Sequence, residues 1–302
     1  MHKINLYIPL GCLMIMNILG TSTAFSKNQP SDIAQRKIIT AGSAITEVVC
    51  ALGHCDDIIA TDRTSIYPEK MQGLPSIGYR NNINAENIIA QAPDLILAEK
   101  GYVRREIINQ LQSTDIEFHA LIDPLSFEDT KTLIREIAEI LNATSKGEKL
   151  IKSMEAEWKE IETSLAAVDT KPKLLFIFSR GPGAQMIAGD ETFVVNLFKM
   201  ASAKNAVTAI KGFKPLNTES LISANPDYVV FGNQGPHVIA AGAKGKNEAL
   251  NIPGMAQTTA GRKLQFITLD LVMISNFGPR LIQAVRELAS AIHPEIQNEL
   301  SR

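Results

Sequence analysis

The sequence predicts an α/β protein of two lobes with parallel sheets, joined by one long α-helix, with a ligand cleft between the lobes. Three observations predict this fold class. Short buried strands alternate with helices in both halves of the chain, a segment near residue 84 recurs near residue 217, and a long amphipathic helix separates the two halves. The chain has 302 residues, which is more than one core usually needs and therefore also favours two domains.

Composition and charge narrow the class of partner. Hydrophobic residues make up 45% of the chain and charged residues 21%, which is ordinary for a globular protein. The formal net charge is −2, and no region concentrates lysine and arginine. The basic footprint of a nucleic-acid-binding protein is therefore missing from the sequence, and we expect no nucleic-acid partner.

The first 24 residues are predicted to be an export signal peptide. Lys3 follows the start, residues 8–19 are apolar, and residues 22–24 are small, as at a cleavage site. A membrane anchor is the alternative, but the apolar run is short and broken. A lipoprotein site at Cys12 fits the pattern poorly. We therefore expect the mature chain in the periplasm.

Two cysteines remain in the mature chain, Cys50 and Cys55. Export permits a disulfide between them, and two unpaired thiols are an equally good interpretation. The chain has no CxxC pair or His/Cys cluster that would predict a zinc site.

The N-terminal lobe is predicted over residues 37–143. Its first strand is a β-branched run that starts at Ile38, and Gly53 ends the helix that follows. The alternation then continues to residue 141, which is typical of a parallel sheet with helices on its faces. Strands are expected at 38–40, 58–60, 95–98 and 117–121, and helices at 45–52, 85–92, 104–113 and 127–141.

A linker helix is predicted over residues 144–168. Ser145 and Glu148 have the spacing of a capping box. An apolar stripe at helical spacing follows, and Glu–Lys pairs four residues apart support it. About 22 residues at 1.5 Å each reach roughly 33 Å, enough to join two lobes. The stripe comprises Leu150, Met154, Trp158, Ile161 and Leu165.

The C-terminal lobe is predicted over residues 169–302. The alternation of strands and helices restarts at Lys173, and a Gly-Pro-Gly turn follows the first strand at residues 181–183. Strands are expected at 173–178, 227–231 and 266–269, and helices at 191–200 and 279–291.

One segment occurs in both halves of the chain. Residues 84–97 and 217–230 share Asn, Glu, Pro and Asp in register, and their apolar positions match in character. Each copy reads as a short helix, a Pro-Asp break and a buried strand, because proline disfavours helix for the residue before it. The repeat therefore predicts two lobes of similar build.

Each copy of the repeat places one acid in the first turn of its helix. Asn84 and Asn217 are the candidate N-caps, and Glu86 and Glu219 follow them. Each glutamate either complements the helix dipole or docks on basic residues of a membrane partner. Both interpretations stay open at this point.

The sequence resembles the periplasmic haem-binding proteins of bacterial ABC haem importers. These belong to a class of helical-linker solute-binding proteins that also holds vitamin B12 and ferric-siderophore binders. The likeness covers nearly all of residues 37–291, and it is carried by the segments GSAITE at 42–47, LPSIGY at 74–79, NAE at 84–86 and FGPR at 277–280. It implies two Rossmann-like lobes, and Glu86 and Glu219 as the residues that dock on the permease.

The resemblance implies that Tyr79 is the axial ligand of the haem iron, with haem as the transported ligand. Tyrosinate is a known haem ligand. A tyrosine phenol has a pKa of about 10, so a nearby cation is needed to favour its anion. Relatives often carry arginine two residues after this tyrosine. In this chain that position is Asn81, and the arginine is Arg80.

Further residues are candidates for contact with haem or its propionates. Arg180 lies where some relatives carry a second haem ligand, and arginine does not ligate iron in that way, which favours one bound haem. Cationic side chains pair well with propionates. The candidate contact residues are Arg80, Arg180, Arg280, Tyr67 and His237.

Two other functions remain as alternatives. The same fold could bind a corrinoid or a ferric siderophore. An enzyme is the third reading, since Asp62, Asp123 and Asp270 follow strands, but the sequence has no nucleophile elbow or phosphate loop. If the protein binds haem, the implied partners are a permease dimer with its ATPase and an outer-membrane haem receptor system upstream. The protein is expected to act as a monomer.

Overall fold

The first sheet is built from the N-terminal half of the chain. In the computed structural model, which describes residues 36–179, 185–233 and 242–300, four parallel strands lie in the order β2-β1-β3-β4. Each predicted strand is present with nearly the predicted bounds. The strands are β1 (Ile38–Ala41), β2 (Ile58–Thr61), β3 (Leu95–Glu99) and β4 (Glu117–Leu121).

Helices cover both faces of this first sheet. Because side chains alternate along a strand, Ile38 packs with α1 and α4 on one face, whereas Ile39 packs with the apolar side chains of α2 and α3 on the other. The β-branched start of β1 is therefore buried on both sides. The helices are α1 (Ser43–Ala51), α2 (Ala85–Ile89), α3 (Arg105–Leu111) and α4 (Phe127–Ile140).

Cys50 and Cys55 are paired. Cys50 in the last turn of α1 forms a disulfide with Cys55, which follows Gly53 at the end of the helix. The structure thus favours the bridge over two free thiols.

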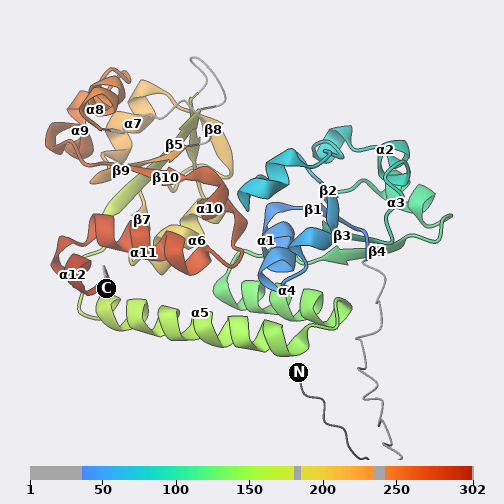
Figure 1. The fold of residues 1–302 in the computed structure, drawn as a ribbon. Helices are drawn as coiled ribbons and strands as arrows, with labels where there is room; N and C mark the ends of the chain where they lie inside the picture. The colour runs from blue at the N-terminus through green and yellow to red at the C-terminus, as the bar shows by residue number, and fades with distance from the viewer. Residues whose placement is uncertain (1–35, 180–184, 234–241, 301–302) are drawn as a thin grey trace, which may run out of the picture. The chain divides into compact units, whose positions relative to one another are not determined.

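One long helix connects the two halves, as predicted. Helix α5 (Thr144–Leu165) packs along α4 and also contacts α11 (Leu281–Ile292) and α12 (Gln297–Leu300) (Figure 1). Gly147 allows the first turn of α5 to approach α4 closely, because a Cβ at this position would lie 2.7 Å from the Cβ of Ala138 in α4.

The predicted capping box of this helix is wrong. The N-cap is Ala143, without a side-chain cap, so Ser145 already lies inside the first turn. Glu148 instead pairs with Arg135 of α4, and Glu155 pairs with Lys131 of the same helix. Glu148 and Glu155 therefore pair with cations of α4 rather than with the lysines four residues further along α5. Such pairing between helices cannot be recognised from the local sequence pattern.

The second sheet has a parallel centre and an antiparallel side. Strands β10, β9, β5 and β7 run parallel, whereas β6 and β8 pair antiparallel beside β5. The fold class is confirmed, but the expectation of an all-parallel second sheet is corrected, because the chain folds back after β5 as a hairpin. The strands are β5 (Lys173–Ser179), β6 (Gln185–Ala188), β7 (Lys204–Asn205), β8 (Phe213–Pro215), β9 (Tyr228–Asn233) and β10 (Phe266–Asp270).

Helices cover the second sheet on both faces as well. The apolar residues of α6, α10 and α11 join one large core that also includes those of α1, α4 and α5. A separate cluster on the opposite face holds Leu175, Val229 and Phe231. The remaining helices are α6 (Phe193–Met200), α7 (Thr218–Ala224), α8 (Gly242–Leu250), α9 (Thr259–Lys263) and α10 (Leu271–Asn276).

The repeated segment forms the same framework in both sheets. Asn84 caps α2 by accepting from the backbone N–H of Asn87, and Asn217 caps α7 by accepting from Ser220, each at 2.8 Å. After each helix, the aspartate of the Pro-Asp break accepts from the backbone N–H at the start of the central strand, again at 2.8 Å. These pairs are Asp94 with Lys37, and Asp227 with Lys173.

No helix in residues 36–179, 185–233 or 242–300 has the length and apolar character that a membrane span needs. The predicted signal peptide lies outside the described residues.

Candidate functional site

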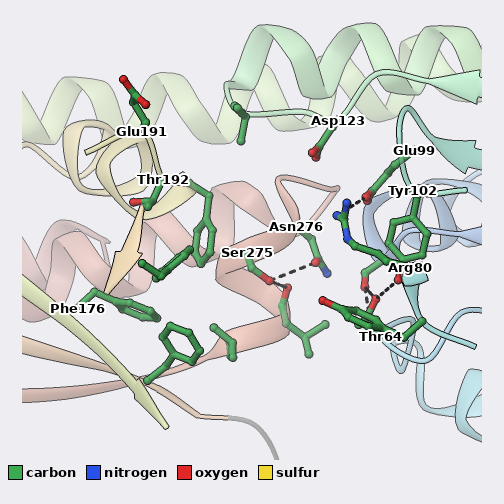
Figure 2. Close-up of a pocket in the computed structure, with 18 residues that line it drawn as sticks. Thr64, Arg80, Glu99, Tyr102, Asp123, Phe176, Glu191, Thr192, Ser275 and Asn276 are labelled. Atoms are coloured by element: carbon green, nitrogen blue, oxygen red, sulfur yellow. Dashed lines mark hydrogen bonds and ion pairs between the residues drawn. The ribbon is translucent and has the colours of Figure 1, made fainter. Parts of the chain in front are cut away.

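A cavity of about 450 Å³ lies where the two sheets face one another (Figure 2). From the first half of the chain it is lined by residues at or just beyond the carboxyl ends of strands, among them Thr64, Glu99 and Asp123. From the second half it is lined by Phe176 of β5 and by residues of α10. Parallel α/β sheets bind ligands at the carboxyl ends of their strands, so the topology makes this cavity the candidate site.

Tyr79 and Arg80 belong to the first wall of the cavity, which is the part lined by residues of the N-terminal half. Tyr79 is 46% exposed, and its ring stands edge-on to that of Tyr102 with 6.3 Å between ring centroids. The Arg80 guanidinium lies over the Tyr102 ring, 4.4 Å from its centroid, a distance at which a cation–π contact is favourable. Within residues 36–179, 185–233 and 242–300 the Tyr79 hydroxyl has no hydrogen-bond partner, and its exposure leaves the phenol available to a ligand.

Glu99 is the second group that contacts the Arg80 guanidinium, besides the Tyr102 ring. Its carboxylate lies 3.3 Å from the arginine Nη2, and Figure 2 shows this contact as a dashed line beside the Tyr102 ring. Burial, and then the charge of Asp123, raises the pKa of Glu99 to about 8, although Arg80 acts in the opposite direction. Burial also raises the pKa of Asp123. The raised pKa shifts Glu99 toward its neutral form, which cancels less of the charge of Arg80 than an ionised carboxylate would.

Asp62 organises the floor beneath these residues. Its buried carboxylate accepts from the Tyr102 hydroxyl, and also from a backbone N–H and the hydroxyls of Thr64 and Ser65. Gly42 donates its backbone N–H to the same carboxylate at 2.9 Å. Gly42 has φ 126°, and a Cβ would collide with the Glu99 side chain, so only glycine fits here. Hydrogen bonding thus holds Tyr102, and through it Arg80, in place.

The second wall is aromatic. Phe178 and Phe213 meet edge-on with 5.1 Å between ring centroids, and Phe193 and Phe176 continue the cluster with centroids 6.1 Å apart. These four phenylalanines, here called the phenylalanine wall, line the cavity together with Leu271 and Val272. Such a surface packs against flat apolar or conjugated groups. One wall of the cavity is therefore polar and the other apolar.

Arg280 forms a buried ion pair between the two halves of the chain. Its Nε and Nη2 contact the two carboxylate oxygens of Glu47 in α1 at 3.0 and 2.6 Å. The centroid of the Tyr67 ring lies 3.7 Å from the guanidinium carbon, and Asn276 donates to the same glutamate at 3.3 Å. Arg280 and Tyr67 are thus brought together, beside the cavity rather than in its lining.

Glu86 and Glu219 are exposed in the first turns of α2 and α7. Neither is in an ion pair within the described part of the chain. Both helices lie in the upper part of Figure 1, each at the edge of its own lobe. The two acids are therefore free to meet an external partner.

Sequence reasoning placed some of these residues and missed others. Tyr79 and Arg80 line the cavity, whereas Arg180 and His237 lie outside the described residues. Glu99 and Tyr102 were not predicted. A charged residue at the end of a buried strand was the available signal for Glu99, as it was for Asp62 and Asp123.

The chain is similar to a known protein family and to curated relatives. The model of the periplasmic binding protein family matches residues 38–272. An uncharacterized ABC transporter substrate-binding lipoprotein of Bacillus subtilis, YvrC, is 26% identical over 87% of this chain and 82% of its own length. A vitamin B12-binding protein of Pectobacterium atrosepticum is 21% identical over 85% of this chain and 88% of its own length.

Solved structures give a second comparison. The periplasmic heme-binding protein RhuT of Roseiflexus sp. RS-1, in its apo form, is 30% identical with a TM-score of 0.78, covering 86% of this chain and 98% of that one. The periplasmic heme-binding protein BhuT, solved with two hemes, is 27% identical with a TM-score of 0.77, covering 88% and 99%. Both likenesses extend across the two sheets and the helix that joins them.

Proposed function

Because the chain belongs to the periplasmic binding protein family, we propose that it captures haem in the cavity between its lobes and delivers it to the permease of an ABC transporter. The observation that carries the proposal is the pairing of two unlike walls, with the exposed Tyr79 phenol on one and the phenylalanine wall on the other. Haem needs both, an axial ligand for its iron and an apolar surface for its ring.

Tyr79 is the proposed iron ligand, and Arg80 is the proposed supporting cation. Arg80 follows Tyr79 directly and is held by Glu99 and the Tyr102 ring. Its positive charge favours the phenolate form of a tyrosine nearby and can pair with a propionate. Tyr67 and Arg280 would act from the edge of the cavity, and Arg180 and His237 remain candidates for contact with the ligand.

Delivery is proposed to use Glu86 and Glu219. Their exposure and their equivalent positions in the two lobes support docking on a permease dimer, with basic residues of each subunit as the proposed partners. Export by a signal peptide over residues 1–24 completes the proposal, and the family name itself supports a location outside the cytoplasm. Membership of a family of binding proteins also argues against the enzyme alternative.

Titration with hemin tests the cargo and its ligand together. The purified protein is expected to give the absorption spectrum of a ferric tyrosinate complex. Tyr79→Phe should lose that spectrum and bind hemin about 100-fold more weakly, about 2.7 kcal/mol. Tyr228→Phe, a half-buried tyrosine away from the cavity, is the matched control and should behave as the wild type.

A corrinoid is the second candidate, because several relatives are vitamin B12-binding proteins. Cyanocobalamin titrated into the same protein separates the two cargoes. The phenylalanine wall favours a ring whose second face carries no axial ligand, so we expect hemin to bind and cyanocobalamin to bind far more weakly. Binding of cyanocobalamin with no spectral change for hemin would overturn the haem proposal.

A further inference from the structure

A second cavity lies in the N-terminal lobe, away from the cavity described above. It has a volume of about 600 Å³ and lies between α3 and the edge strand β4, sharing no lining residue with the first cavity. Its apolar lining includes Val103, Ile108 and Phe118. Val103 is 3% exposed, and the other two are half-buried and pack against the core of the lobe. The core therefore supplies a preformed apolar floor.

Three cations surround this floor. Lys100, Arg104 and Arg105 line the cavity and are exposed, and no acidic side chain lines it with them. Within the ranges that the structure describes, none of the three is in an ion pair. In contrast, other arginines of the chain are paired with glutamates, among them Arg80, Arg135, Arg280 and Arg286.

Three like charges in the lining of one cavity repel one another when the cavity is empty and attract an anion. Arginine in particular binds phosphate and carboxylate groups through paired hydrogen bonds. The carboxamides of Asn109 and Gln112 add neutral donors to the lining. The cavity volume lies within the ordinary range for small-molecule sites, about 300–1,000 Å³.

We propose that this cavity binds an anionic amphiphile, meaning a molecule with one phosphate or carboxylate group and an apolar chain. The three cations bind the head group, and Val103, Ile108 and Phe118 contact the chain. Such a molecule could come from solution or from the anionic lipid of a membrane. The site does not depend on haem binding, because it uses none of the residues of the first cavity.

Calorimetric titration with dodecyl phosphate, below its micelle concentration, tests the site. The triple variant Lys100→Gln, Arg104→Gln, Arg105→Gln should bind at least tenfold more weakly than the wild type. The variant Lys149→Gln, Lys152→Gln, Lys171→Gln removes the same charge at exposed positions elsewhere and should bind as the wild type does. Equal binding by both triple variants would overturn the proposal. Hemin titration of the first triple variant should be unchanged, which also shows that it folds.

The apolar part of the proposal needs its own test. Ala120, an exposed residue of β4 in the lining, can be enlarged by Ala120→Trp, which fills space without altering charge. This variant should also weaken dodecyl phosphate binding at least tenfold, and inorganic phosphate should bind the wild type at least tenfold more weakly than dodecyl phosphate. Equal affinity for the two phosphates would refute the amphiphile.

Vesicles distinguish the two sources. Co-sedimentation of the wild type, but not the first triple variant, with phosphatidylglycerol vesicles and not with phosphatidylcholine vesicles would assign the site to membrane lipid. Binding of dodecyl phosphate without binding to either vesicle would assign it to a soluble amphiphile. Absence of binding to dodecyl phosphate and to both vesicles would overturn the proposal.

Discussion

The two lobes share a framework and differ where they face the cavity. Asn84 and Asn217 cap equivalent helices, and Asp94 and Asp227 anchor equivalent central strands. Beyond the strand ends the resemblance stops. The first lobe presents tyrosine, arginine and carboxyl groups, whereas the second presents the phenylalanine wall. A repeated framework thus carries two unlike surfaces, and the cavity needs both.

One contact that helps to hold these unlike surfaces opposite one another is the Glu47–Arg280 ion pair. The glutamate side chain is 3% exposed and that of the arginine 16%, so Arg280→Met leaves a buried carboxylate without its cation. We expect the free energy of unfolding to fall by about 3–5 kcal/mol, measured by urea denaturation. The double variant with Glu47→Gln should recover part of the loss. Additive losses would mean that the pair does not couple the lobes.

Glu99, in the polar wall, should make the free energy of unfolding depend on pH. Its pKa is about 8 in the folded chain, against an ordinary value of 4.5. Between these values the folded chain holds a proton that the unfolded chain has lost, so the free energy of unfolding falls as pH rises from about 4.5 to 8. Glu99→Gln should remove this fall, which is on the order of 3–5 kcal/mol.

Urea denaturation at pH 5 and at pH 8.5 measures this difference. Glu139→Gln, an exposed glutamate of α4, serves as the control and should keep the wild-type dependence. An unchanged pH dependence in Glu99→Gln would show that burial of this carboxyl does not control stability in that window.

The phenylalanine wall is tested by Phe213→Ala. This change removes the partner of Phe178 in the closest edge-on contact of the wall. Loss of an aromatic contact of this kind should weaken hemin binding about tenfold, about 1.4 kcal/mol, without altering the tyrosinate spectrum. Leu125→Ala truncates an exposed apolar residue elsewhere in the lining and should weaken binding less. A lost spectrum in Phe213→Ala would mean that the two walls do not act separately.

The shared framework should respond equally in both lobes. Asn84→Ala and Asn217→Ala each remove one helix cap with a 2.8 Å hydrogen bond. Each should lower the free energy of unfolding by about 1 kcal/mol. The two losses should add, since the two caps lie in different lobes and share no partner. A large difference between them, measured by denaturant titration, would break the equivalence of the two copies.

The sequence predicted the parts of the fold that follow from local patterns. The strands of the first sheet, helix α5 and the framework of the repeat carry β-branched runs, an apolar stripe and cap residues that can be recognised one segment at a time. Strands β6 and β8 could not be predicted in this way. Each is short, and each gains its stability from pairing with residues distant along the chain.

The candidate site was predicted only in part for the same reason. Tyr79 was found through a resemblance to a family, and Arg80 through its position beside that tyrosine. Glu99 and Tyr102 act through contacts between segments, and no motif in the sequence distinguishes the phenylalanines of the second wall. Only the folded chain brings Phe178 of β5 against Phe213 of β8.

The most direct test of this account is a crystal structure of the hemin complex. We expect iron bonded to the phenolate oxygen of Tyr79, with the opposite face of the haem ring against the phenylalanine wall. Iron bonded to a side chain of the second lobe, or hemin bound with no contact to Tyr79, would contradict the central claim that one wall ligates and the other packs.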